Sequence, residues 1–153
     1  MALRNIIKDG DPALGKKSRP VEKFDEKLAL LIDDMKDTMY NANGVGLAAV
    51  QVGILRRVVV IDIGDGFTEL VNPEIIESSE ERQLETEGCL SFPGEVVYTN
   101  RPMTVKVKGQ DRNGKWHIYK GSALKARAFC HELDHLDGIV IRDVAVDPPE
   151  EKE

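Results

Sequence analysis

The sequence predicts an α+β domain in which short, mainly antiparallel strands pack around a buried central helix, with an amphipathic helix nearer the N-terminus. Three observations predict this class. An early segment repeats apolar residues at helical spacing, the middle of the chain is rich in short β-favouring runs, and a later segment is apolar around most of its circumference. The 153 residues, 41% hydrophobic and 31% charged, suffice for one domain with a sizeable core.

The first predicted helix begins at Asp25, a residue type that caps helix N-termini. Its apolar residues recur at steps of three and four, with charged residues between them, and are Leu28, Leu31, Ile32, Met35 and Met39. Asn43 and Gly44 follow, and both residue types favour the left-handed conformation that ends helices. This segment is therefore expected to be an amphipathic helix.

Residues 55–121 contain six short β-favouring runs, at 57–63, 70–71, 74–76, 95–98, 104–108 and 116–119. Turn-forming residues separate them at 64–66, 72–73, 100–102 and 111–114. Asp111 to Lys115 is predicted to be a hairpin turn with Asn113 and Gly114 at its tip. The second helix is predicted to be capped by Ser122 and to run to about Asp137, ending at Gly138. Because its apolar residues surround it, this helix is expected to be buried.

Charge and composition argue against nucleic-acid-binding and membrane-spanning proteins. With 21 Lys and Arg against 27 Asp and Glu, the net charge is -6, so no direct nucleic-acid binding is expected. No apolar stretch is long enough to span a membrane, charges interrupt the apolar residues at 1–9, and the chain has only two cysteines, so a cytoplasmic protein is expected. We expect one domain over 1–146 and an acidic, solvated tail over 147–153.

The strongest chemical signal is the run His131-Glu132-Leu133-Asp134-His135 in the second helix. His131 and His135 are four residues apart and share a helix face, so both imidazoles can reach one metal ion. Glu132 points about 100° away from His131, where it can handle protons rather than bind the metal. The alternative is that two histidines occur here by chance and bind nothing.

A metal site on this helix needs a further ligand, and either cysteine offers a thiolate. Cys130 faces away from the histidines on the helical wheel and is expected to be a core residue. Cys89 lies in the run Glu87-Gly88-Cys89-Leu90-Ser91 and is the better ligand candidate, although alone it would be interpreted as a structural thiol.

The third feature is the run Gly-Val-Gly-Leu-Ala-Ala-Val-Gln at 44–51. It follows a helix and lacks the third glycine of a dinucleotide-binding motif, so a Rossmann fold is excluded. A simple sharp turn is one interpretation. The other is a backbone packed tightly along a cleft, with the Gln51 amide facing inward.

Together these segments resemble the peptide deformylases, whose motifs GxGxAAxQ, EGCxS and HExDH occur in this order. Here they read GVGLAAVQ at 44–51, EGCLS at 87–91 and HELDH at 131–135, and the resemblance runs from about residue 3 to 145. It implies a metal-dependent hydrolase that removes the formyl group from N-formylmethionine of newly synthesised polypeptides and releases formate.

The resemblance also implies residue roles. One metal ion per chain, Fe²⁺ or its substitutes Zn²⁺, Ni²⁺ and Co²⁺, would be bound by Cys89, His131 and His135, with water in the fourth position. That water would attack the formyl carbonyl with Glu132 as general base and then acid. The Gln51 side chain and the Leu90 backbone N–H would stabilise the oxyanion.

The methionine side chain calls for a narrow apolar pocket. Leu124 and Ala128 lie on the metal side of the helical wheel, and we expect them to line that pocket together with Val45 and the Gly46 backbone. Ordinary core packing is the alternative for these four residues.

Asp134 lies about 60° from His131 on the wheel and is a candidate to orient a ligand imidazole. A salt bridge elsewhere, for example with Arg101, is the alternative. Two positions depart from the family pattern, since Val50 replaces a common proline and Cys130 replaces a common glutamine. Some members carry a long basic C-terminal helix implicated in ribosome docking, whereas this chain ends in acidic residues, so only transient proximity to the ribosome is expected.

Two other functions stay open. The HExxH pattern also occurs in zinc endopeptidases, which would cleave internal peptide bonds and use a ligand other than Cys89. An inactive metal-binding or ribosome-associated adaptor would keep the fold without turnover, but it would not need Glu132, Gln51 and Cys89 together.

Overall fold

The computed structural model describes residues 2–150 and has the predicted α+β class with antiparallel strands. Its helices are η1 (Pro12–Gly15), α1 (Glu26–Asn41), η2 (Ala49–Val52), α2 (Leu124–Leu136) and α3 (Ile141–Val144). Its strands are β1 (Gly46–Ala48), β2 (Val58–Ile61), β3 (Thr68–Ser78), β4 (Arg82–Cys89), β5 (Phe92–Pro102), β6 (Thr104–Gln110), β7 (Trp116–Ser122) and β8 (Ala145–Val146).

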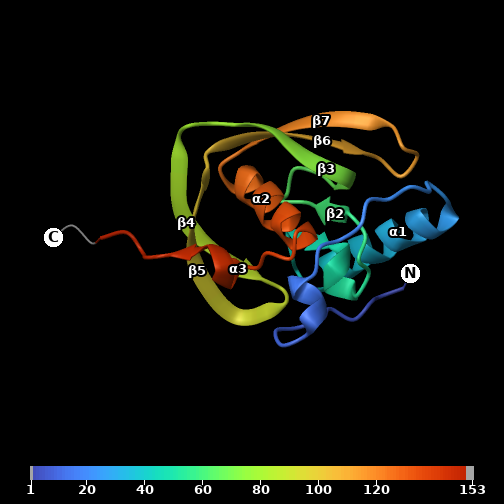
Figure 1. Ribbon diagram of the computed structural model, residues 1–153, viewed down its shortest axis with the longest axis horizontal. Coiled ribbons are helices and arrows are strands. Elements are labelled where there is room, and N and C mark those ends of the chain that lie inside the picture. Colours follow the sequence, from blue (N-terminus) through green and yellow to red (C-terminus); the bar gives the residue numbers. More distant parts are fainter. Residues whose placement is uncertain (1, 151–153) are drawn as a thin grey trace.

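The strands form two sheets that partly enclose α2 (Figure 1). The larger sheet has the order β1-β2-β3-β6-β7 and the smaller one the order β4-β5-β8, and every pairing within them is antiparallel. Helix α2 contacts strands of both sheets, whereas α1 packs on β1 and β2. The helix that carries His131 and His135 therefore lies where the two sheets meet.

Strand β2 shows why both faces of the larger sheet are covered. Val59 and Ile61 belong to the apolar cluster around α2, while Val58 and Val60 belong to the cluster beneath α1. Successive side chains of a strand point to opposite faces, so a run of four apolar residues is buried on both sides. Strand β2 therefore lies between the two apolar clusters of the core.

The start of α1 is fixed by a residue next to it in the sequence, but the start of α2 is not. Asp25 accepts a hydrogen bond from the Leu28 N–H at 3.0 Å, which caps α1. The prediction that Ser122 caps α2 is wrong. Ser122 ends β7, paired with Thr104, and the turn into α2 is made by Ala123, whose φ is 53°. The Ala123 N–H donates to the Met103 carbonyl at 2.8 Å, so a contact distant in sequence fixes this turn.

Two predicted turns are also wrong. Strand β3 continues through Asn72 and Pro73 with an irregularity in its pairing to β6, because the Asn72 side chain is held by Val21 and Gln110. Residues 100–102 lie within β5, which pairs with β4 along its length. The hairpin turn after Asp111 is confirmed, since the Asp111 N–H donates to the Lys115 carbonyl at 2.9 Å.

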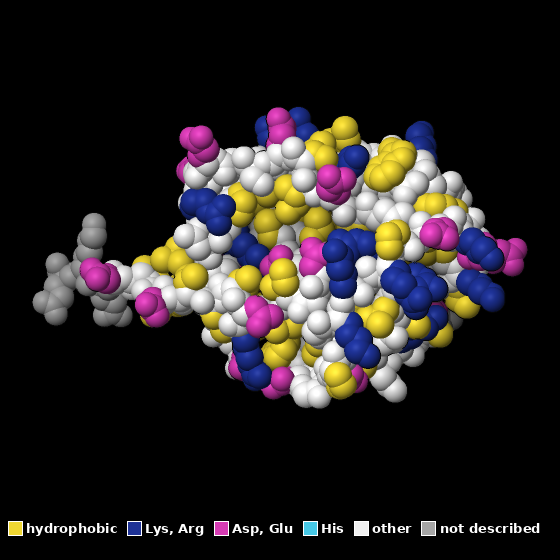
Figure 2. All heavy atoms as spheres, viewed as in Figure 1, with side chains coloured by type: hydrophobic (Ala, Val, Ile, Leu, Met, Phe, Trp, Pro, Cys, Tyr) yellow, Lys and Arg dark blue, Asp and Glu magenta, His cyan; other side chains and the backbone are white. Residues whose placement is uncertain are grey.

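Lys, Arg, Asp and Glu side chains are interspersed over the face shown in Figure 2. Residues 147–150 of the predicted tail are exposed and outside regular structure, and residues 151–153 lie outside the described residues. Within residues 2–150, none of the helices has the length and apolar character required to cross a membrane.

Candidate metal centre

The structure brings Cys89, His131 and His135 together. Their potential ligand atoms all lie within 4.8 Å of one another. Cys89 is the last residue of β4, and the two histidines share one face of α2. The Cys89 Sγ lies 3.3 Å from the His135 Nε2, and the two imidazole centroids are 4.9 Å apart. Strand and helix thus converge on one point.

The donor set fits a tetrahedral divalent metal. Two ligands on such a metal, one sulfur and one nitrogen at typical bond lengths, are about 3.5 Å apart, close to the separation of Cys89 and His135. Burial lowers the pKa of His135 to about 3, which keeps the ring in its neutral, ligating form. Burial also disfavours the charged form of His131, but Glu132, Cys89 and Glu87 raise its pKa well above its usual value. The surroundings of His131 therefore favour the positively charged form of its ring.

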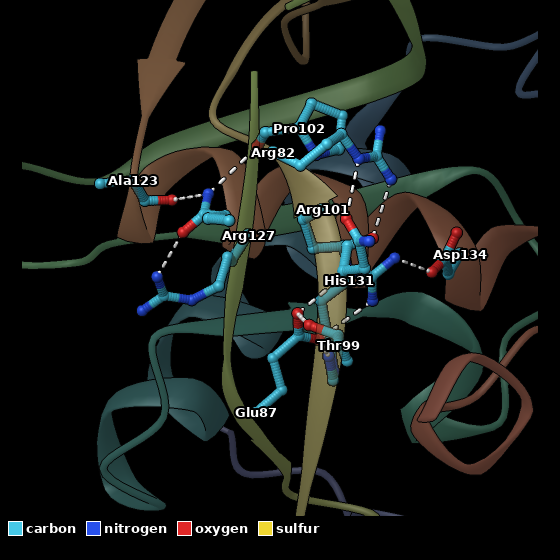
Figure 3. Close-up of polar contacts among 11 residues, drawn as sticks. Arg82, Glu87, Thr99, Arg101, Pro102, Ala123, Arg127, His131 and Asp134 are labelled. Atoms are coloured by element: carbon cyan, nitrogen blue, oxygen red, sulfur yellow. Dashed lines mark hydrogen bonds and ion pairs between the residues drawn. The ribbon is translucent and has the colours of Figure 1, made fainter. Parts of the chain in front are cut away.

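Glu87 orients His131. Its Oε1 lies 3.1 Å from the His131 Nδ1, which leaves Nε2 of that ring for a metal (Figure 3). Glu87 also accepts hydrogen bonds from Arg101 Nε at 2.9 Å and Thr99 Oγ1 at 2.5 Å. Burial alone would raise the pKa of Glu87, but the His131 and Arg101 hydrogen bonds lower it to about 2. This role of Glu87 was not predicted from the sequence, although Glu87 stands two residues before Cys89 and therefore on the same strand face.

Asp134 lies in a salt bridge with Arg101 at 2.6 Å, the alternative left open by the sequence. The Arg101 guanidinium therefore joins Asp134 to Glu87, as Figure 3 shows. Asp134 reaches His131 only through these two residues.

Glu132 is 3% exposed and faces the candidate site. Burial raises its pKa to about 7; the nearby His131 opposes this rise, and Glu87 and Asp134 add to it. Its Oε1 atom is buried and has no hydrogen-bond partner within residues 2–150. The Gly46 backbone packs against the same carboxylate, and a methyl group at Gly46 would overlap it.

The Gln51 side chain is held with its amino group toward Cys89. Its Oε1 accepts from the Ala48 N–H at 2.9 Å, which fixes the orientation of the amide. Its Nε2 lies 3.1 Å from the Ser91 Oγ and 3.6 Å from the Cys89 Sγ. Ser91 belongs to the EGCLS motif, but its contact with Gln51 was not predicted from the sequence.

A cavity of about 610 Å³ opens beside these groups. Its lining includes Leu90, and it includes all four residues predicted for the pocket, which are Val45, Gly46, Leu124 and Ala128. It also includes Arg127, for which the sequence gave no pocket role. Cys130 lies in the apolar core around α2, and its burial raises the pKa of the thiol to about 11.

Comparisons with known proteins agree over nearly the whole chain. Residues 3–151 match the family described as Polypeptide deformylase. The peptide deformylase of Alkaliphilus metalliredigens is 54% identical over 94% of this chain and 97% of its own, and that of Caldicellulosiruptor bescii is 56% identical over 95% and 87%. The crystal structure of peptide deformylase from Thermotoga maritima has a TM-score of 0.94 at 44% identity, covering 96% of this chain and all of that one. The Ehrlichia chaffeensis enzyme in complex with actinonin has a TM-score of 0.93 at 37% identity, covering 95% and 90%.

Proposed function

The chain belongs to the polypeptide deformylase family, and from this premise we propose that the enzyme hydrolyses the formyl amide of N-formylmethionine on newly synthesised polypeptides. Water is consumed as the C–N bond breaks. Its oxygen is added to the formyl carbon, which leaves as formate, and a proton is added to the amine, which becomes the free N-terminus. The observation that carries the proposal is the meeting of Cys89, His131 and His135 beside the buried carboxylate of Glu132.

Cys89, His131 and His135 would hold one Fe²⁺ per chain, with Zn²⁺, Ni²⁺ or Co²⁺ as substitutes, because a thiolate and two imidazoles suit all four ions. Such an ion supplies Lewis-acid polarisation of the carbonyl and a lowered pKa for water. Glu87 holds the His131 ring in the orientation that this role requires.

Glu132 is the proton carrier in this proposal. A carboxyl group with a pKa of about 7 can accept a proton from water and then donate it to the leaving amine near neutral pH. Its buried, unpaired Oε1 is free to accept that proton. The tight packing of Gly46 limits the positions that the carboxylate can take.

The Gln51 amino group and the Leu90 backbone N–H would donate hydrogen bonds to the oxyanion. The fixed orientation of the Gln51 amide supports this role, because a donor that is already aligned needs no rearrangement during the reaction. One such donor is typically worth about 3 kcal/mol of transition-state stabilisation.

Val45, Gly46, Leu124 and Ala128 would bind the methionine side chain, since all four line the cavity beside Glu132. The partners are then N-formylmethionyl nascent chains, met in the cytoplasm during transient proximity to the ribosome. Neither a nucleic acid nor a membrane is required for this reaction.

The products of one peptide distinguish this function from endopeptidase activity. We expect mass spectrometry of formyl-Met-Ala-Ser incubated with the metal-loaded protein to show loss of the formyl group alone. Acetyl-Met-Ala-Ser is the control and should stay intact. Internal fragments from either peptide would contradict the proposal and favour an endopeptidase.

A further inference from the structure

Arg127 places a cation in the wall of the cavity that contains Glu132. It lies on α2, and Arg127 and Lys8 are the two Lys or Arg residues of the lining. Within residues 2–150 it forms no salt bridge, and its side chain donates one hydrogen bond, to Gln83. Its Nε is buried without a partner. A guanidinium has five N–H donors, so this cavity wall holds donor capacity that the protein leaves unused.

The position of the guanidinium is fixed by Gln83 on β4. The Arg127 Nη1 donates to the Gln83 Oε1 at 2.6 Å. The Gln83 Nε2 in turn donates to the Pro102 and Ala123 carbonyls at 3.0 and 2.9 Å, contacts that can be followed in Figure 3. Since both amide hydrogens are engaged, the Gln83 oxygen has only one direction in which to point. Arg127 is therefore anchored across the cavity wall rather than extended into solvent.

The spacing along α2 relates Arg127 to the proposed reaction centre. Arg127 precedes His131 by four residues, so it lies on the same helix face about 6 Å along the axis. Leu124 and Ala128, the proposed contacts of the methionine side chain, adjoin it on this face. Leu124, Arg127 and Ala128 line the same cavity, so a methionine side chain held by Leu124 and Ala128 would lie in a cavity that Arg127 also borders.

We propose that Arg127 determines specificity for the first residue and extends the substrate class to peptides that begin with N-formylmethionine sulfoxide, an inference that rests on the proposed function. The thioether of methionine is a weak hydrogen-bond acceptor, whereas the sulfoxide oxygen is a polar one that is costly to bury without a donor. The anchored guanidinium supplies that donor. A wholly apolar pocket would reject the oxidised side chain.

The test compares formate release from three peptides that differ only in the first residue: formylmethionine, formylmethionine sulfoxide and formylnorleucine, each followed by Ala-Ser. The wild-type protein should hydrolyse the sulfoxide peptide with a kcat/KM no more than about tenfold below that of the norleucine peptide. In Arg127→Met, the ratio of sulfoxide to methionine kcat/KM should fall at least about tenfold, the loss expected for one hydrogen bond to a charged donor. The ratio is taken on one preparation, so it does not depend on the folded fraction.

Lys8→Met is the matched control, because it replaces the other Lys or Arg residue of the lining with the same side chain, and it should leave the ratio unchanged. An unchanged ratio in Arg127→Met, or a wild-type protein that discriminates more strongly than tenfold against the sulfoxide relative to norleucine, would overturn the inference while leaving deformylation intact. Release of formate from none of the three peptides would instead overturn the proposed function.

Discussion

Glu87 holds several side chains of the candidate site in position, because its carboxylate accepts hydrogen bonds from His131, Arg101 and Thr99. These donors stabilise its charged form, so its pKa lies near 2 in the folded protein and near 4.5 in the unfolded chain. A carboxyl group with a lowered folded pKa adds stability above its unfolded pKa and loses that contribution as the pH falls toward the folded pKa.

Acid unfolding of the metal-free protein measures this contribution. Between about pH 5 and pH 2, we expect the wild type to lose about 3 kcal/mol of unfolding free energy through Glu87, more than Glu87→Gln loses over the same range. Urea titrations at several pH values give both curves. Parallel curves for the two proteins would show that Glu87 is not held in its charged form.

The sequence was enough to single out the three candidate metal ligands that the structure brings together, but not the groups that position them. His131 and His135 follow from spacing on one helix, and Cys89 follows from a short motif. Glu87 could not be assigned a partner, because its contact with Arg101 depends on the pairing of β4 with β5. Similarly, the Gln83–Arg127 contact joins residues 44 positions apart.

At the scale of elements, β1 and α2 meet through Gly46. The Glu132 carboxylate occupies the space that a side chain at Gly46 would need, so the strand can lie this close to the helix only with glycine. The approach of these two elements fixes where the proposed proton carrier lies.

We therefore expect Gly46→Ala to lower kcat for formate release at least about tenfold, because the added methyl group displaces Glu132. Gly15→Ala is a matched control, since a methyl group there meets no atom within 4 Å, and it should retain full activity. Circular dichroism verifies that both variants fold. Equal rates for Gly46→Ala and the wild type would mean that Glu132 tolerates displacement.

The caps and turns that depend on contacts between neighbouring residues could be predicted from the sequence. Those that depend on contacts between distant residues could not. Asp25 caps α1 through a residue three positions away, and the turn after Asp111 closes within five residues. The start of α2 depends instead on the Met103 carbonyl, which accepts a hydrogen bond from Ala123. The course of β3 depends on Val21, which is distant in the sequence from its partner Asn72. Local residue preferences do not contain that information.

On the scale of the whole molecule, the proposed metal joins the two sheets through α2. Cys89 comes from the smaller sheet, and both histidines come from α2, which contacts strands of both sheets and more of those in the larger one. An ion bound only by the folded arrangement stabilises the whole protein.

Removal of the metal should therefore lower the free energy of unfolding by about 4 kcal/mol relative to protein in metal at a thousand times Kd. For a chain of this size that corresponds to a fall in Tm of roughly 10 °C. Differential scanning calorimetry with and without a chelator gives the difference, and Cys89→Ala should abolish it. A full metal-dependent shift in Cys89→Ala would indicate a different third ligand.

The most direct test of the account is formate release from formyl-Met-Ala-Ser by anaerobically purified, Fe²⁺-loaded protein beside its Glu132→Gln variant, with metal content measured in both. We expect rapid release by the wild type and a rate at least about 100-fold lower in the variant at equal metal content. Equal rates, or no release by wild-type protein that contains the metal, would contradict it.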